Sequence, residues 1–348
     1  MKPEDKLLFL CARQDFSDAH LKALLDLCDA ERIAWEEALF TAVQHGVAPL
    51  VWTNIEKAIP VGLEIPNGIV DRFRLSCYRN AVVKGTREAN LAEALALLST
   101  YSIKVMALKS VALDLLVYEQ AWYTTAADTD LVLHPRQQDL SPQILAEINH
   151  VFGGLGIEYD FYEHHDVTNN GLLPVDFERI WNDARSVSFQ GHDLFLMSAE
   201  DMLLSLCINS RRKRFFRIRS LVDIAETMNG YPELDWATLS DRARAYQCNH
   251  IVYTALLVTQ MTLGCSLPGP VLDRLDVGRV KAATVHRLVP FLIEHLPLAA
   301  LSFYTGREVF GRKVGWSLVL PYAIESWPQI GRRVQQAYQA WSQPKHVD

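Results

Sequence analysis

The chain has 348 residues, of which 49% are hydrophobic and 22% are charged, and its formal net charge is −7. This length is enough for one large packed unit or two smaller ones, and the composition excludes a wholly disordered chain. The acidic balance argues against a long nucleic-acid-binding surface, although it is compatible with a local basic patch.

The first hundred residues are predicted to be helical. Residues 5–60 carry apolar side chains at helical spacing, and Gly46 ends or turns one of these helices. A longer helix is expected over about 66–99. Near its end, the positions i, i+3, i+4 and i+7 are filled by Leu91, Ala94, Leu95 and Leu98.

A change of pattern at Ile103 indicates a small sheet. Short runs of apolar, β-branched and aromatic residues predict three strands, at 103–108, 128–133 and 157–168. Helices are expected between them, at 111–118 and 142–152, and glycines at 153, 154 and 156 are expected to break the second helix. This alternating order predicts a small mixed sheet flanked by helices.

Beyond Asn169 the chain is again predicted to be mainly helical. Ser198 and Asp201 fit the signature of a capped helix N-terminus, and further helices are expected over 235–265 and 280–342. The fold class is therefore expected to be α+β. We expect three regions: a helical region at 1–100, an α/β core at 101–195 and a helical region at 196–348.

Asp128 and Asp130 are the first candidates for chemistry. Side chains two residues apart on a strand share a face, so this pair can direct two carboxylates to one divalent cation. Mg²⁺ prefers a few carboxylates together with phosphate oxygens and water, and such a site supports in-line phosphoryl displacement. The pattern alone is short, and it is also typical of two solvated acids at a strand start.

Lys109 and Ser110 are candidates for binding phosphate. They follow the first predicted strand and open the next helix, whose N-terminus favours an anion. Lys109 can place a point charge on a phosphate, and Ser110 can cap the helix or bind the phosphate itself. The alternative for Lys109 is an exposed lysine at a helix start.

The third predicted strand offers a third carboxylate. Asp160 is preferred, with His164 beside it on the same face, and Glu158 shares that face. The adjacent His164 and His165 are expected to point apart, so solvated or hydrogen-bonded histidines are favoured over a metal pair.

The densest basic cluster is the run from Arg211 to Arg214, followed by Arg217 and Arg219. A solvated helix face is the usual explanation of such a run, and triphosphate binding, with Arg214 as a candidate, is the alternative. The chain contains neither a P-loop motif nor the Gly-x-Ser-x-Gly motif of common hydrolases.

Cysteine usage and hydropathy indicate a cytoplasmic protein. The six cysteines form no Cys-x-x-Cys pair, so buried free thiols are expected rather than a zinc site. No signal peptide is recognised, and no uncharged apolar stretch reaches the ~18 residues that a membrane-spanning helix needs.

Four segments together resemble the bacterial uncharacterised nucleotidyltransferase family, a divergent branch of the polymerase-β-like nucleotidyltransferase superfamily. The segments span roughly residues 5 to 275, and their order and spacing carry the likeness. They are the helical motif at 45–50, the Leu-Lys-Gly-like segment at 105–113, the Asp-x-Asp strand at 128–133, and the helical pair at 196–204 and 221–225.

The resemblance implies a nucleotidyltransferase palm with bound Mg²⁺ or Mn²⁺ and a nucleoside triphosphate substrate, ATP being expected. Asp128 and Asp130 match the metal carboxylates of the family, and Lys109 matches its lysine. Ser110 stands where the family has glycine, and Thr124 stands about where an arginine precedes the acidic pair.

The expected activity is transfer of a nucleoside monophosphate, with release of pyrophosphate, to a protein, a peptide or a small molecule. Long nucleic acid is the least favoured acceptor because of the net charge. Asp160 is expected to complete the metal site or to act as base. Two alternatives stay open: a non-catalytic interaction protein that retains the fold, and a phosphotransferase that moves the γ-phosphate.

Overall fold

The computed structural model describes residues 1–125, 128–295 and 298. It confirms the expected α+β class, because a small mixed sheet lies within a mainly helical protein. None of the helices in these residues has the length and apolar character to cross a membrane. The boundaries proposed for three regions stay a prediction.

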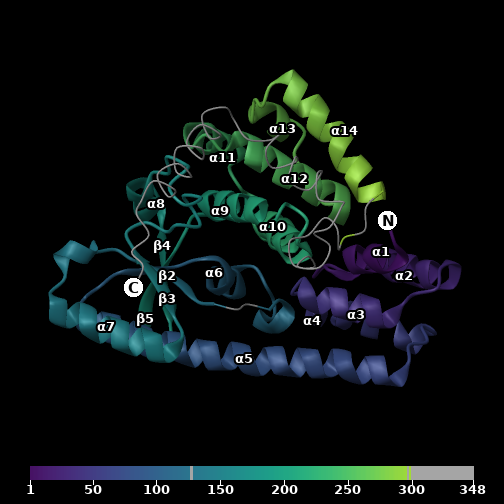
Figure 1. The fold of residues 1–348 in the computed structure, drawn as a ribbon, viewed down its shortest axis with the longest axis horizontal. Helices are drawn as coiled ribbons and strands as arrows, with labels where there is room; N and C mark the ends of the chain where they lie inside the picture. Colours follow the sequence, from purple (N-terminus) through teal and green to yellow (C-terminus); the bar gives the residue numbers. More distant parts are fainter. Residues whose placement is uncertain (126–127, 296–297, 299–348) are drawn as a thin grey trace, which may run out of the picture.

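The N-terminal residues form helices, as expected. They are α1 (Pro3–Cys11), α2 (Asp18–Ala30), α3 (Trp35–Gln44), α4 (Ala48–Glu56), the 3-10 helix η1 (Ile59–Val61) and α5 (Asn67–Thr100). With 34 residues, α5 is about 50 Å long. Figure 1 shows it along one edge of the molecule, with α3 and α4 beside its N-terminal half and the sheet beside its C-terminal half.

The central part of the chain forms a five-stranded sheet in the order β3-β2-β1-β5-β4. Its strands are β1 (Val105–Ala107), β2 (Asp130–Leu133), β3 (Glu158–Phe161), β4 (Arg185–Phe189) and β5 (His192–Leu196). β1 pairs antiparallel with β2 and parallel with β5, and β2 pairs parallel with β3. The helices and 3-10 helices between the strands are α6 (Lys109–Leu116), η2 (Ala121–Tyr123), η3 (Gln137–Asp139), α7 (Pro142–Leu155) and α8 (Phe177–Asp183).

Two observed strands are shorter than expected, and the missing ends are those that carry candidate site residues. β2 begins at Asp130, so Asp128 lies in the segment before the strand. β3 ends at Phe161 because Tyr162 has a left-handed φ of 62° and the Glu163 amide bonds the Phe161 carbonyl at 2.7 Å. The alternation of faces expected beyond residue 161 is therefore wrong.

Two further predictions for this part are corrected by the structure. α7 continues through Gly153 and Gly154 and ends at Leu155, and Gly156 follows as a left-handed cap with a φ of 66°. The hairpin of β4 and β5 lies in a stretch predicted to be mainly helical. Its signal was the turn Gln190-Gly191, where both residues have positive φ, between segments of alternating polarity.

The rest of the described chain is helical, as expected. The helices are α9 (Ala199–Arg212), α10 (Ile218–Gly230), α11 (Trp236–Ala245), α12 (Asn249–Leu263), α13 (Val271–Arg274) and α14 (Arg279–His295). Ser198 caps α9 by accepting the Asp201 amide at 3.2 Å. Helices were also expected over 280–342, and the part of this range after His295, apart from Leu298, lies outside the described residues.

His45 and Gly46 join the N-terminal helices to the start of α10. The Ile218 amide donates to His45 Nδ1 at 3.0 Å, and both residues are buried. Gly46 has a φ of 72°, and a Cβ there would lie 2.6 Å from Thr125 Oγ1, so only glycine fits. The Gly46 carbonyl also accepts the Thr125 amide at 3.1 Å. This junction holds Thr125 and the start of the helix that carries Arg219 against the N-terminal helices.

We predict that His45 makes the protein less stable in acid. Burial and then Arg217 lower the pKa of His45 from 6.5 to about 4. Between these values the unfolded chain binds more protons than the folded chain, so the free energy of unfolding falls as the pH falls. His45→Asn keeps an acceptor for the Ile218 amide but does not titrate.

Denaturant unfolding at pH 7 and pH 5 measures this effect. Between the two conditions, the wild type is expected to lose about 2 kcal/mol more than His45→Asn does. If the free energy of unfolding falls equally in the two proteins, protonation of His45 does not contribute to the acid sensitivity.

A cleft between strand ends and a basic helix pair

Three carboxylates meet where β2 and β3 begin. Asp130 and Glu158 are partners in the parallel register of these strands, so they lie side by side on one face. Asp128 comes from the segment just before β2. Oxygens of the three carboxylates all lie within 4.8 Å of one another. Asp130 is buried, whereas Asp128 and Glu158 are exposed.

Asp160, the acid preferred from the sequence, belongs to a neighbouring group. Its carboxylate accepts the His165 side chain at 2.9 Å and the His165 amide at 3.2 Å. Burial raises the pKa of Asp160, but these hydrogen bonds outweigh it and the net shift is downward. The two histidine rings do not point apart: His164 and His165 stack with their centroids 4.5 Å apart.

His164 links the two groups of acids. Its Nδ1 accepts the Asp166 amide at 3.1 Å, so in the neutral ring the proton is on Nε2. Nε2 lies 3.9 Å from Asp130 Oδ1 and 3.8 Å from Asp160 Oδ2. Burial, followed by the charge of Lys109, lowers the pKa of His164 to about 4. His164 therefore presents an N–H to the acids, and this tautomer has no lone pair for a metal there.

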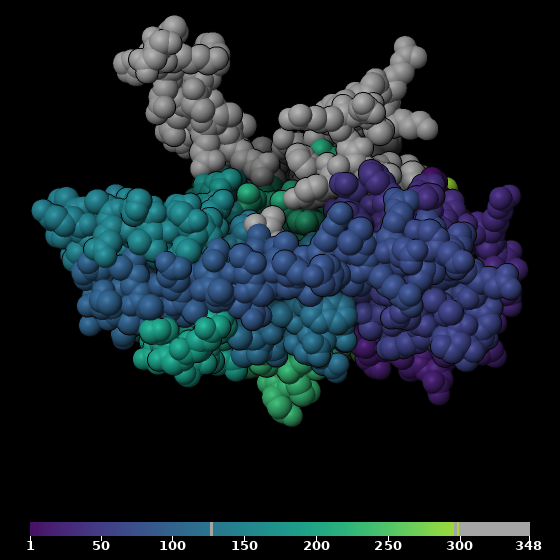
Figure 2. Space-filling model, turned by 90° about the horizontal axis from the view of Figure 1, so that it is seen from below, coloured from purple at the N-terminus to yellow at the C-terminus, as the bar shows by residue number. Residues whose placement is uncertain are grey.

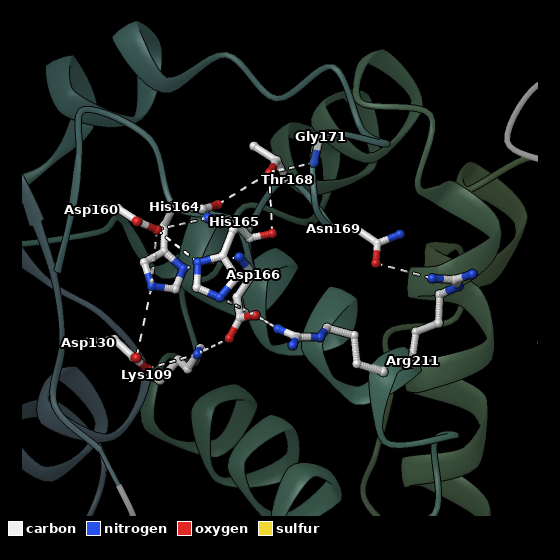
Figure 3. A network of polar contacts seen from close by, with 11 residues as sticks. Lys109, Asp130, Asp160, His164, His165, Asp166, Thr168, Asn169, Gly171 and Arg211 are labelled. Atoms are coloured by element: carbon white, nitrogen blue, oxygen red, sulfur yellow. Dashed lines mark hydrogen bonds and ion pairs between the residues drawn. The ribbon is translucent and has the colours of Figure 1, made fainter. Parts of the chain in front are cut away.

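Lys109 lies between two carboxylates, as Figure 3 shows. Its Nζ donates to Asp130 Oδ2 at 2.8 Å and to Asp166 Oδ2. The Lys109 backbone has a φ of 45°, a left-handed conformation that turns the chain from β1 into α6. Ser110 follows, is buried, and directs its hydroxyl to the Asp128 carbonyl at 3.4 Å.

Basic side chains form the other side of the cleft. Arg212 and Lys213 come from the C-terminal end of α9, and Arg217 and Arg219 come from the start of α10. Arg212 pairs with Asp166, and Arg219 lies 3.5 Å from Asp223. Arg214, the candidate named from the sequence, does not line the cleft.

The cleft has a volume of about 230 Å³. Five carboxylates line it, from Asp128, Asp130, Glu158, Asp166 and Asp223, together with five cations, from Lys109, Arg212, Lys213, Arg217 and Arg219. Three of the acids lie at the strand ends, whereas four of the cations lie on the helix pair. This division suits a ligand that carries a divalent cation at one end and several phosphate oxygens at the other.

Three contributors were not assigned a role from the sequence. Strand alternation predicts that Glu158 shares the face of Asp160, but only the strand register pairs it with Asp130. Asp166 falls within the strand predicted over 157–168, but it lies in the turn after β3, where it pairs with Lys109 and Arg212. Arg87 on α5 donates to the Asp128 carbonyl at 3.4 Å, and its distance along the chain left no local signal.

Comparison with known proteins supports the resemblance read from the motifs. The model of a family described as uncharacterised nucleotidyltransferase matches residues 31–264, about two thirds of the chain. Neither a curated protein nor a solved structure shows significant similarity. The matched range contains every strand of the sheet and all the residues that line the cleft. The chain belongs to the uncharacterised nucleotidyltransferase family, and its general activity is therefore that of a transferase of nucleotidyl groups.

Proposed function

We propose that this protein is a Mg²⁺-dependent nucleotidyltransferase that uses ATP and modifies a protein, a peptide or a small molecule. One observation carries the proposal. The carboxylates of Asp128, Asp130 and Glu158 meet within 4.8 Å at one side of a cleft whose other side is basic. A family relationship alone gives neither the metal nor the nucleotide.

The donor set fits Mg²⁺ or Mn²⁺. Three carboxylates from two strands and the segment before them provide hard oxygen ligands, and the cleft leaves room for phosphate oxygens. Asp128, Asp130 and Glu158 would hold the metal, which supplies Lewis-acid stabilisation of charge on the α-phosphate. Glu158 takes the third position in this proposal, and Asp160 orients His165.

The basic residues have a separate role. Arg212, Lys213 and Arg217 lie where they can bind the β- and γ-phosphates, and Lys109 adds a charge beside them. An acceptor hydroxyl forms a bond to the α-phosphorus while the bond to pyrophosphate breaks. The hydroxyl proton passes to a carboxylate of the cleft, and the arginines stabilise the departing pyrophosphate.

A second candidate is an interaction protein that keeps the fold without catalysis. Its support is that the Lys109 ammonium already neutralises Asp130, and that Ser110 is buried where the family has glycine. The experiments below separate the two candidates, because only the enzyme needs metal and triphosphate.

Substitution of Glu158 tests the third carboxylate. Glu158→Gln is expected to weaken Mn²⁺ binding at least roughly tenfold, like Asp130→Asn, because each removes a charged ligand. Asp160→Asn is the matched control and is expected to change the affinity little. Titration with Mn²⁺, followed by electron paramagnetic resonance, measures the affinity of each variant. If Asp160→Asn weakens Mn²⁺ binding more than Glu158→Gln does, then Asp160, and not Glu158, is the third metal ligand.

Removal of the acidic pair tests the activity. Asp128→Ala/Asp130→Ala is expected to abolish transfer from ATP and to weaken binding of ATP with Mg²⁺ in calorimetry. Asp71→Ala, an exposed aspartate outside the cleft, serves as the control. Asp130→Asn gives a milder variant, and circular dichroism checks folding.

The mass of the product distinguishes the reaction types. Nucleotidyl transfer adds a nucleoside monophosphate to the acceptor, whereas a phosphotransferase adds only phosphate. Equal binding of ATP by the wild type and the double variant, or no binding by either, contradicts the metal-site proposal.

Two arginines three residues apart test the phosphate side. Arg217→Gln is expected to weaken ATP binding roughly tenfold and AMP binding little, because charge-assisted bonds to the outer phosphates are lost. Arg214→Gln is the control, since Arg214 does not line the cleft. Calorimetry with both nucleotides gives the comparison. An equal loss for ATP and AMP, or a larger effect at Arg214, contradicts this assignment.

A further inference from the structure

A second hollow, the α3–α5 groove, lies on the face formed by α3 and α5. Its volume is about 520 Å³, and its lining residues are Leu39, Phe40, Val43, Arg72, Leu75, Ser76, Arg79, Asn80, Val83 and Thr125. The α5 members follow the spacing 3-1-3-1-3, so they form one stripe along the helix. In the view from below, Figure 2 shows α5 as a blue band across the molecular surface.

Apolar side chains are concentrated on this face. Of the eleven exposed large hydrophobic residues in the described part of the chain, six lie on α3 and α5. They are Phe40, Val43, Leu75, Tyr78, Val82 and Val83, with exposed fractions between 44% and 69%. Four of the six, Phe40, Val43, Leu75 and Val83, line the groove. Single exposed apolar residues are common, but four that line one groove mark an interaction site.

The charges in the groove are of one sign. Arg72 and Arg79 are its ionisable lining residues, although the whole chain is acidic. Arg72 pairs with the exposed Glu36, whereas Arg79 has no acidic partner among the described residues. The groove therefore complements a segment that combines apolar side chains with Asp or Glu.

A hydrogen bond connects the lining of the groove with the lining of the cleft. Thr125 lines the groove, and its carbonyl accepts a hydrogen bond from Arg219, which lines the cleft. Asn80, from the stripe on α5, donates to the carbonyls of Trp122 and Thr124 at 2.6 and 3.2 Å and holds this segment in place. Thr125 and Asp128 are three residues apart, a span of at most about 11 Å.

We propose that the α3–α5 groove docks an amphipathic, acidic segment of the acceptor, and that the acceptor is a protein. The role of the docked protein as acceptor rests on the proposed nucleotidyl transfer, whereas the docking itself does not depend on it. A second copy of the groove fits less well, because its ionisable lining residues are the same two arginines and offer no carboxylate to pair with them. Nucleic acid fits less well too, because five of the ten lining residues are apolar and only two are cationic.

Neighbouring valines provide a matched pair of variants. Val83 lines the groove, whereas Val82 is exposed on the same helix and does not line it. A random 14-residue peptide library is displayed against the full-length wild type, and the selected peptides are measured by fluorescence anisotropy. We expect peptides with apolar residues at i, i+3 or i+4 and with Asp or Glu. Val83→Glu is expected to weaken them tenfold or more and Val82→Glu less than twofold.

A charge swap makes the test specific. The Arg79→Glu variant is expected to lose affinity for the selected peptide. It is expected to bind a counterpart of that peptide in which Lys replaces Asp and Glu. Selection of basic peptides, or binding that Val83→Glu leaves unchanged, overturns the proposal. So does a wild-type dimer in sedimentation that Val83→Glu dissociates, or a photo-crosslinker at Leu75 that reacts only with the protein's own chain.

The acceptor role has its own readout. The selected peptide is extended with a tail containing Ser, Thr and Tyr and is incubated with Mg²⁺ and ATP labelled at the α-phosphate. The wild type is expected to label the tail, Val83→Glu to label it at least tenfold less below saturation, and Asp128→Ala/Asp130→Ala to bind but not label it. Docking without label on the tail contradicts the acceptor role. Failure of the protein to bind ATP contradicts the proposed function, whatever the groove binds.

Discussion

The burial of the Asp130 carboxylate constrains the whole centre of this protein. Only 3% of Asp130 is exposed, and a buried charge is costly unless a partner compensates it. Lys109 provides the partner, and its left-handed backbone turns β1 into α6 so that its side chain reaches back to β2. The same ammonium holds Asp166 in the turn after β3. One ion-paired group thus connects the end of β1, the start of β2 and the turn after β3.

The helices bring the cations to this centre. His45 accepts the first amide of α10, and Gly46 lets the segment with Thr125 approach closely, so the N-terminal helices fix the place of Arg219 and Arg217. The cleft is therefore built from parts that lie far apart in the sequence. Thr125 also lines the α3–α5 groove, and its hydrogen bond with Arg219 connects the two surfaces.

The sequence was sufficient for the fold class and for the residues that local patterns define. Helical spacing predicted α5, and the short apolar runs predicted β1 and β2 close to their observed positions. It was not sufficient for features set by pairing between strands. The choice of Glu158 beside Asp130 depends on register, and the stacking of His164 on His165 depends on the turn that begins at Tyr162. The hairpin of β4 and β5 was missed although Gln190-Gly191 carried a turn signal.

We propose above that Asp128, Asp130 and Glu158 hold the metal of a nucleotidyl-transfer site. The most direct measurement is the anomalous scattering of Mn²⁺ in crystals of the protein with a non-hydrolysable ATP analogue. The account predicts one or two manganese ions about 2.1 Å from oxygens of these three carboxylates, with the outer phosphates against Arg212 and Arg217. Manganese bound by Asp160 with the histidines, or an analogue bound away from the cleft, would contradict it.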